Sequence, residues 1–138
     1  MELKEIILQL EELKGIKFGS FKLKNGLMSP VYFDLRVIVS KPKLMKGISN
    51  ILWKQFEGHG KTDLLCGVPY TALPLATIIS VDSDLPMLIR RKEVKQYGTK
   101  KLIEGDFHKG QNCLIIEVRK IVDFQGGTLK FLAKMAKF

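Results

Sequence analysis

Residues 63–80 read DLLCGVPYTALPLATIIS, and this stretch decides the fold class. It opens with a short apolar run at 63–68, which is typical of a buried strand. A turn that contains Pro69 follows, and the sequence then predicts an apolar helix around 72–80. Strand, turn and helix in this order form the unit from which parallel α/β sheets are built.

Two further strands are predicted on the C-terminal side of this unit. Residues 86–90, PMLIR, and 112–117, NCLIIE, are short and apolar. Strands of this kind favour a parallel α/β sheet that is covered on both faces. Residues 91–105 lie between them and are polar, basic and glycine-punctuated, which indicates a loop.

The N-terminal part adds a helix, a hairpin and a second helix. Apolar residues in 2–15 recur at three- and four-residue steps, the spacing of an amphipathic helix. Residues 16–24 alternate in polarity before an Asn-Gly pair at 25–26, a strong hairpin signal, and 31–35 make the return strand. The second helix is predicted over about 42–56.

The composition is that of one modest globular domain. The chain has 138 residues, 46% hydrophobic and 27% charged, a balance that excludes a disordered tail, a collagen-like fibre and a coiled coil. Lys and Arg total 23 against 14 acids, and the net charge of +9 favours anionic partners such as phosphates, nucleic acid or an acidic membrane surface. With no secretory signal and no apolar run near the ~20 residues of a membrane span, a cytoplasmic protein is expected.

The residue types that most often bind metals are few. Cys66 and Cys113 lie in apolar runs and are expected to be reduced core residues. His59 and His108 have no Cys, Asp or Glu at ligand spacing, so a dedicated metal site is not expected.

The first candidate functional segment is the hairpin FGSFKLKNGLMSPVYFDLR at 18–36. Lys24 falls at its turn, where the ammonium group could face an anion. Tyr32 and Phe33 are adjacent on a strand and point to opposite faces, so one of them is available to flank a planar ligand. The alternative is a structural hairpin with solvated lysines.

The second segment, CGVPYTALP at 66–74, joins a strand to a helix. Such turns present backbone N–H groups at a helix N-terminus, which favours an anion. The alternative is an ordinary strand-to-helix connection.

The third segment, RRKEVKQYGTKK at 90–101, holds six bases, with Glu93 as its only acid. It is interpreted as a flexible cationic lid, because positive charges that close over a polyphosphate would stabilise a departing pyrophosphate. The alternatives are a solvated loop and a nucleic-acid patch. Because Tyr97 is its only aromatic residue, stacking on bases would be poor, and no nucleic-acid partner is expected.

Together these segments resemble orotate phosphoribosyltransferase, as found in the N-terminal domain of animal uridine monophosphate synthase. The resemblance is carried by FGSFKLKNGLMSPVYFDLR, CGVPYTALPLATII and PMLIRRKEVKQYGTKKLIEG, continues through CLIIE, and covers about 15–117. It implies an α/β fold of the type I phosphoribosyltransferase kind, a parallel sheet with an N-terminal hood, which would be C-terminally incomplete here.

The resemblance also implies an activity and partners. In this family ribose 5-phosphate passes from phosphoribosyl pyrophosphate (PRPP) to orotate, giving orotidine 5′-monophosphate and pyrophosphate in the synthesis of UMP. Mg²⁺ accompanies PRPP. The basic loop closes over the neighbouring subunit's site, so a homodimer is implied, and no membrane partner is expected.

By motif position, the resemblance assigns roles to individual residues. The catalytic candidates are the loop cations Arg91, Lys92 and Lys95, with Lys95 the strongest. Lys24 is assigned to PRPP binding. Tyr32 and Phe33 are assigned to orotate, and Tyr70 and Thr71 to pyrophosphate. Tyr97 and Glu117 are also assigned to substrate binding. Thr71 replaces a Lys, and Tyr97 a His, of the bacterial pattern.

After Glu117 the chain departs from the family. Members continue with a second acid and a Gly/Thr/Ser-rich loop that cradles the 5′-phosphate of PRPP, whereas residues 118–121 read VRKI. A Lys/Arg pair does not supply the converging backbone N–H groups of such a loop. Unlike an acid, it also cannot accept hydrogen bonds from ribose hydroxyls. Weak or absent activity is therefore expected, with a non-catalytic domain that pairs with full-length subunits as the alternative.

Residues 118–138 are thus expected to be a divergent basic tail on a single, partial domain spanning 1–138. Residues 122–127, VDFQGG, resemble the VDREQGG strand end of the family, which would fit an internal deletion; a splice or frameshift tail is the other interpretation. Residues 128–138 are predicted as a basic amphipathic helix that partly covers the apolar surface and sheet edge left by the missing strands.

Overall fold

The chain divides into two compact units. The computed structural model describes residues 1–23, 26–58, 60–93, 102–123 and 126–137. One unit comprises Met1–Ile48 and Arg119–Lys130, and the other Ser49–Val118 and Phe131–Phe138. The prediction of a single domain over 1–138 therefore stays a prediction.

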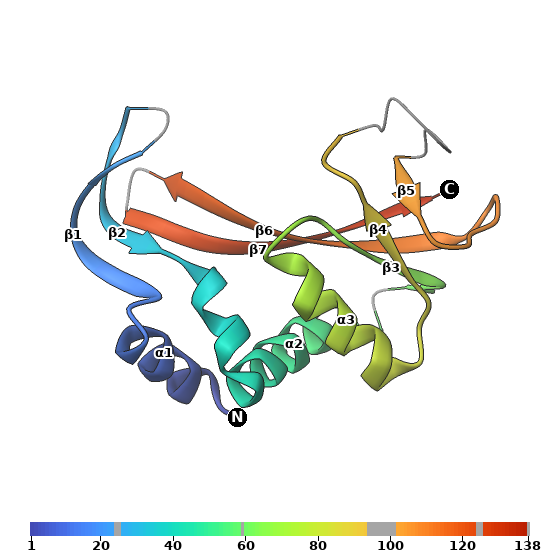
Figure 1. Cartoon of the computed structure of the whole chain (residues 1–138), viewed down its shortest axis with the longest axis horizontal. Coiled ribbons are helices and arrows are strands. Elements are labelled where there is room, and N and C mark those ends of the chain that lie inside the picture. The colour runs from blue at the N-terminus through green and yellow to red at the C-terminus, as the bar shows by residue number, and fades with distance from the viewer. Residues whose placement is uncertain (24–25, 59, 94–101, 124–125, 138) are drawn as a thin grey trace. The chain divides into compact units, whose positions relative to one another are not determined.

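The first unit begins with a helix and a hairpin (Figure 1). Helix α1 covers Leu3–Glu12, and strands β1 (Ile16–Lys22) and β2 (Met28–Phe33) pair antiparallel. A 3₁₀ helix, η1 (Leu35–Ser40), leads into α2 (Pro42–Phe56), which also enters the second unit. The helices and hairpin expected from the sequence are confirmed, whereas η1 was not expected. The buried apolar residues of this unit are Ile6, Leu10, Val31, Leu35, Ile38, Leu44 and Ile48.

Gly15 joins the end of α1 to the end of the hairpin. Its carbonyl accepts a hydrogen bond from the backbone N–H of Asp34 at 2.7 Å. A Cβ at this position would lie 3.0 Å from Val37 Cγ2 and 3.2 Å from the Asp34 carbonyl oxygen. A glycine therefore suits this position between α1 and β1, because the two backbones approach closely here.

The second unit is organised around the sheet β5-β4-β3-β6-β7. Strand β3 (Leu64–Gly67) lies between β4 (Met87–Arg90) and β6 (Asn112–Asp123) and runs parallel to both. The two-residue strand β5 (Ile103–Glu104) pairs antiparallel with β4, and β7 (Gly126–Lys137) lies next to β6. The sheet is thus mixed, with the predicted parallel strands at its centre.

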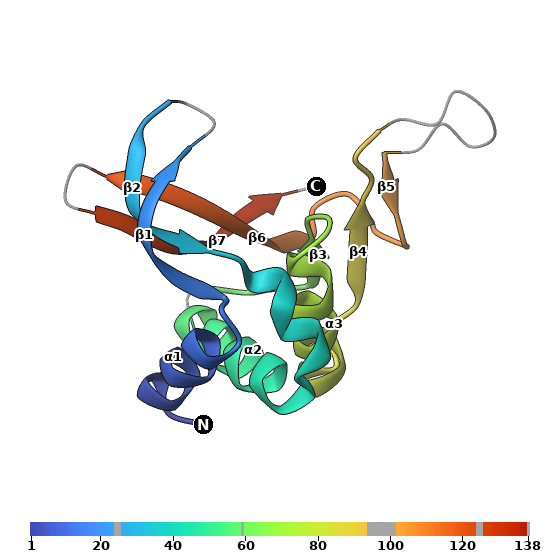
Figure 2. The ribbon, with the colours of Figure 1, turned by 60° about the vertical axis from the view of Figure 1, so that its left-hand side comes forward.

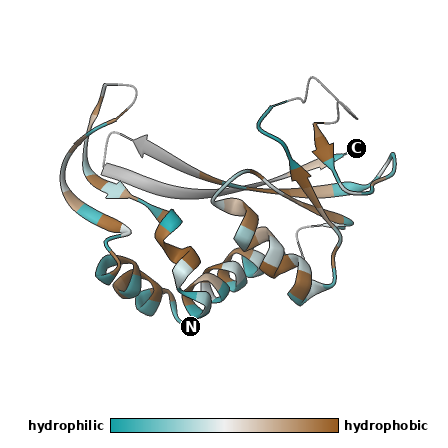
Figure 3. Ribbon diagram, in the orientation of Figure 1, coloured by the Kyte–Doolittle hydropathy of each residue, from teal (hydrophilic) through white to brown (hydrophobic). Residues whose placement is uncertain are grey.

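Helix α3 (Ala72–Ser83) packs on one face of this sheet, against β3 and β4 (Figure 2). Gly67 permits this approach, because a Cβ there would lie 3.0 Å from Ala76 Cβ and 3.2 Å from Leu73 Cα. The other face carries a buried cluster, and the ribbon of β4 and β5 is largely hydrophobic in Figure 3. This cluster comprises Leu64, Cys66, Leu88 and Cys113, with Ile103 and Ile115 packed against it.

The tail is where the sequence prediction is wrong. Strand β6 continues to Asp123 instead of ending near 117, and 126–137 form β7 where a helix over 128–138 was predicted. The apolar residues Leu129, Phe131, Ala133 and Met135 also recur at every second position, so the pattern fits a strand as well as a helix. An isolated short helix is marginal, whereas pairing with β6 satisfies the backbone, and this pairing decides the structure.

Candidate functional site at the carboxyl edge of the parallel strands

The parallel strands of the second unit end at one edge of the sheet. In the register of β3 and β6, Gly67 lies opposite Ile116, and Val68 N–H donates to the Ile116 carbonyl at 3.0 Å. Segments that follow the carboxyl ends of parallel strands are where α/β proteins bind ligands. Here these segments carry Tyr70 and Thr71 after β3, Arg91 and Lys92 after β4, and Glu117 in β6.

Tyr70 and Lys92 meet at this edge. The Lys92 Nζ atom lies 4.5 Å from the centre of the Tyr70 ring, although 22 residues separate them in sequence. Tyr70 is 70% exposed, and such contacts at exposed sites contribute about 0.5–1 kcal/mol. The contact brings the end of β4 onto the turn between β3 and α3 within one chain, whereas the resemblance implies a loop that closes over the neighbouring subunit's site.

Thr71 directly precedes α3. Its backbone is helical, with φ −66° and ψ −31°, and its side chain makes no capping hydrogen bond. Leu73 N–H donates to the Tyr70 carbonyl at 3.2 Å, and the peptide bond between Pro69 and Tyr70 is cis. The positive end of the α3 dipole therefore lies beside the Tyr70–Lys92 contact.

Arg91 points to a different partner from its neighbour Lys92. Its Nε–H donates to Glu104 Oε1 on β5, an Nη nitrogen forms an ion pair with the same oxygen, and its backbone N–H donates to the Leu102 carbonyl at 2.8 Å. The Arg91 side chain is 29% exposed and that of Glu104 is 40% exposed. Sequence reasoning missed Glu104, because 103–104 were assigned to a loop.

Glu117 is half-buried in the interior of β6. The backbone of 118–123 continues as a strand beyond it, so this part of the chain forms no loop at the edge. The residues that, by the resemblance, would form the 5′-phosphate loop after Glu117 are thus part of the sheet.

The aromatic pair assigned to a planar ligand lies in the first unit. Tyr32 and Phe33 are half-buried in β2, and the Tyr32 ring lies 5.5 Å from that of Phe21, tilted by 41°. The remaining assigned residues, Lys24, Lys95 and Tyr97, lie outside the described residues, as does most of the lid predicted over 90–101.

The two thiols lie within the sheet, Cys66 on β3 and Cys113 on β6. Cys66 and Cys113 are both free and buried. A hydrogen bond with Cys66 and burial raise the pKa of the Cys113 thiol. A buried thiol of this kind is a core group and a poor nucleophile.

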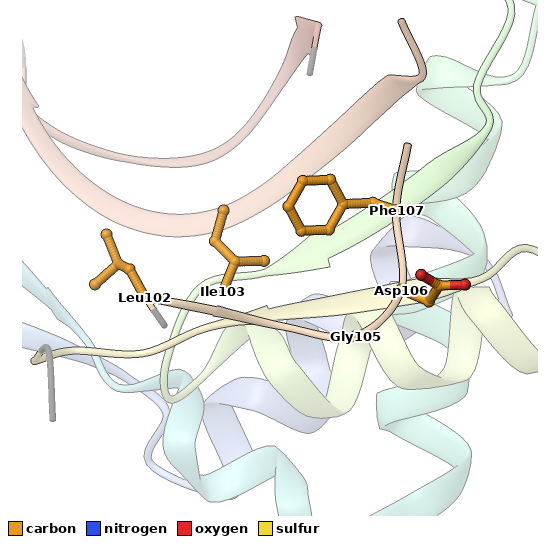
Figure 4. A pocket seen from close by; sticks show the side chains of 5 residues that line it. All are labelled: Leu102, Ile103, Gly105, Asp106 and Phe107. Atoms are coloured by element: carbon orange, nitrogen blue, oxygen red, sulfur yellow. The ribbon is translucent and has the colours of Figure 1, made fainter. Parts of the chain in front are cut away.

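A pocket of about 420 Å³ opens beside β5 (Figure 4). It is lined by Leu102, Ile103, Gly105, Asp106 and Phe107, and the Phe107 ring extends toward Ile103. Of the assigned residues that the structure describes, none lines it.

The described residues offer neither a metal cluster nor a membrane span. No three His, Cys, Asp or Glu side chains among them come together as ligands. Likewise, no helix in the described part of the chain is long and apolar enough to cross a bilayer.

Comparison with known proteins identifies the relatives of this chain. No protein-family model matches it. The uridine 5′-monophosphate synthase of Bos taurus is 51% identical over 113 residues, and the orotate phosphoribosyltransferase of Caenorhabditis elegans is 42% identical over 109. Over most of its length, this chain is homologous to orotate phosphoribosyltransferases. These alignments cover 81% and 78% of the chain, but only 24% and 48% of the two relatives.

Solved structures agree with this homology. The UMP synthase of Leishmania donovani superposes with a TM-score of 0.69 at 36% identity, covering 80% of this chain and 24% of that one. The orotate phosphoribosyltransferase of Aeropyrum pernix gives 0.64 at 25% identity, covering 76% of this chain and 60% of that one. The predicted type I phosphoribosyltransferase-like α/β fold is therefore confirmed, and the chain spans a quarter to about half of the curated relatives it matches.

Proposed function

We propose that the chain is an orotate phosphoribosyltransferase domain of UMP synthesis. Its reaction transfers ribose 5-phosphate from PRPP to orotate and releases pyrophosphate with orotidine 5′-monophosphate. Homology supports the proposal, and one structural observation carries it: Lys92 meets Tyr70 beside the start of α3, at the carboxyl edge of the parallel strands. The resemblance assigns Tyr70 to pyrophosphate binding and Lys92 to the catalytic cations of the loop.

The chemistry of this edge suits a leaving pyrophosphate. Negative charge grows on that group as the bond to the ribose carbon breaks. The Lys92 ammonium and the positive end of the α3 dipole stabilise this charge, because both are fixed close to Tyr70 and Thr71. Interactions that strengthen with the developing charge accelerate the reaction, whereas uniform binding does not.

Magnesium fits this site as an ion that PRPP carries. The described residues provide no cluster of three ligands, but Mg²⁺ is commonly held by substrate phosphates with only one or two carboxylates. The resemblance assigns Glu117 to substrate binding and assigns no residue of this chain to the metal. The ion would neutralise diphosphate charge, while Lys92 and Tyr70 orient the group.

The PRPP side of the site is expected to be impaired. The 5′-phosphate needs a loop of converging N–H groups, and residues 118–123 use their backbone in β6. We therefore expect weak or absent turnover from this chain. Because residues 118–123 form a strand, the structure also favours the second candidate, a non-catalytic domain that pairs with full-length subunits.

Orotate binding tests the proposed function. Calorimetric titration should give saturable binding of orotate and none of uracil, which lacks the carboxylate. Tyr32→Ala should weaken orotate binding about tenfold or more, as expected when a well-packed aromatic contact is lost, whereas Phe18→Ala, which removes a 73% exposed ring of the same hairpin, should not. Absence of orotate binding by the folded chain would refute the proposal.

Assembly distinguishes the two candidates. The homodimer is proposed from the resemblance, and sedimentation of the chain alone measures it. Mixing the chain with an intact homologue and measuring the mass of the complex tests the non-catalytic candidate. Formation of a mixed complex, with no orotidine 5′-monophosphate made by the chain itself, would favour the non-catalytic candidate.

A further inference from the structure

The consecutive cations at the end of β4 differ in what they contact. Lys92 lies over the Tyr70 ring and, among the described residues, has no carboxylate within 4.0 Å as an ion-pair partner. Arg91 instead donates its Nε–H to one oxygen of Glu104 and forms an ion pair with the same oxygen through an Nη nitrogen. One of the two charges assigned to pyrophosphate is therefore already neutralised by the chain itself.

The backbone fixes the Glu104 carboxylate beside Arg91. In the antiparallel ladder of β4 and β5, Ile89 lies opposite Glu104 and Arg90 opposite Ile103, and the Arg91 N–H to Leu102 bond extends the ladder. Arg91 and Glu104 are thus diagonal neighbours on one face of the pair, within reach of long side chains. The contact follows from the register of the strands.

The residue after Glu104 anchors this arrangement. Gly105 has φ +113°, a conformation that L side chains rarely adopt, and a Cβ there would lie 2.7 Å from Leu88 Cδ2 and 3.2 Å from the Met87 carbonyl oxygen. Strand β5 is therefore held tightly against β4 at this point, although it contains only two residues. The carboxylate is preorganised and pays little ordering entropy to meet Arg91.

We propose that Glu104 is an intramolecular counter-ion of Arg91. Its carboxylate pairs with the guanidinium group until pyrophosphate displaces it. The inference rests on the proposed function of this edge. A partly exposed ion pair is weak, so a diphosphate with several charges can displace a single carboxylate. Glu104 then lowers the affinity for pyrophosphate. It also favours release, because its carboxylate competes with the product for the Arg91 guanidinium group.

Removal of the carboxylate tests this competition. Calorimetry with inorganic pyrophosphate should show that Glu104→Gln binds it about threefold to tenfold more tightly than the unmodified chain, the range expected for one weak ion pair. Glu93→Gln is the matched control, since it removes the same charge from an exposed position two residues from Arg91. The control should change the affinity by less than about twofold.

A double-mutant cycle ties the effect to Arg91. Arg91→Gln should weaken pyrophosphate binding, and adding Glu104→Gln to this variant should produce no further change, because the competing pair is already absent. A thermal melt of each variant establishes that it is folded at the assay temperature. Should Glu104→Gln be unfolded, Glu104→Asp, whose shorter side chain weakens the pair, should show a smaller gain in affinity.

The outcomes separate this inference from the proposed function. Equal or weaker pyrophosphate binding by folded Glu104→Gln would overturn the inference and make Glu104 a structural anchor of β5. Failure of every variant to bind pyrophosphate would overturn it as well. The proposed function is judged independently by orotate titration, which does not involve Arg91 or Glu104.

Discussion

At the scale of single residues, the neighbours of a charge decide what it can do. Arg91 and Lys92 are adjacent and chemically similar, yet one contacts a carboxylate and the other an aromatic ring. The sequence motif assigned both to the same anion, since it specifies residue type and position alone. The pairing with Glu104 depends on the register of β4 and β5, which the motif does not encode.

Asp34 illustrates the same point for pH. Two hydrogen bonds from the Arg36 guanidinium, both at 2.7 Å, and one from its backbone N–H hold the pKa of the Asp34 carboxyl below its usual value of 3.8. Because the folded-state pKa is lowered, the stabilisation is present above the unfolded-state pKa and is lost as the pH falls through the folded-state pKa.

We expect Asp34→Asn to lower the Tm by about 2–5 °C at neutral pH, and the difference to vanish once the pH is below the folded-state pKa of Asp34. Thermal melts of both proteins from neutral pH to below pH 3.8 measure it. Asp106→Asn, an exposed carboxylate, is the control. A difference in Tm that persists unchanged at the acid end would show that the carboxylate charge is not what stabilises the fold.

At the scale of elements, the close packing of α3 on β3 leaves little room for a side chain at Gly67. Gly67→Ala should destabilise the second unit by about 1–3 kcal/mol, because the added Cβ would meet Ala76 Cβ and Leu73 Cδ2 at 3.0 Å and Leu73 Cα at 3.2 Å. Urea unfolding followed by circular dichroism measures the change. Val81→Ala, at a 76% exposed position of the same helix, should change stability by less than about 0.5 kcal/mol. Equal effects of the two substitutions would mean that α3 is not closely packed at Gly67.

Elements were predictable where local pattern and tertiary partner agree. The periodicity of 2–15 and the apolar run of 63–68 each fit one structure, and α1 and β3 are found there. Residues 128–138 fit two periods, so the choice lay with a partner that the pattern does not contain: β6. Strand β5 was missed for a related reason, since two residues are too few to show a period.

At the scale of the whole chain, the structure after Glu117 departs from the phosphate-binding loop that the resemblance implies. The edge built by β3 and β4 carries the Tyr70–Lys92 contact that we propose for pyrophosphate, whereas the chain beyond Glu117 runs on as β6. The two ends of PRPP should therefore be recognised unequally. The net charge of +9 adds a general attraction for any anion, which falls with salt and must be separated from specific binding.

We expect PRPP and inorganic pyrophosphate to bind this chain with affinities within about threefold of each other, because the 5′-phosphate finds no cradle and adds little free energy. Calorimetry with both ligands in the presence of Mg²⁺ measures the ratio, and ribose 5-phosphate alone, which should not bind, is the control. If the shared diphosphate dominates binding, higher salt should lower the affinity for both ligands by similar factors. PRPP binding tighter than pyrophosphate binding by about tenfold or more would place a functioning 5′-phosphate site in the chain and remove the physical reason to expect impaired turnover.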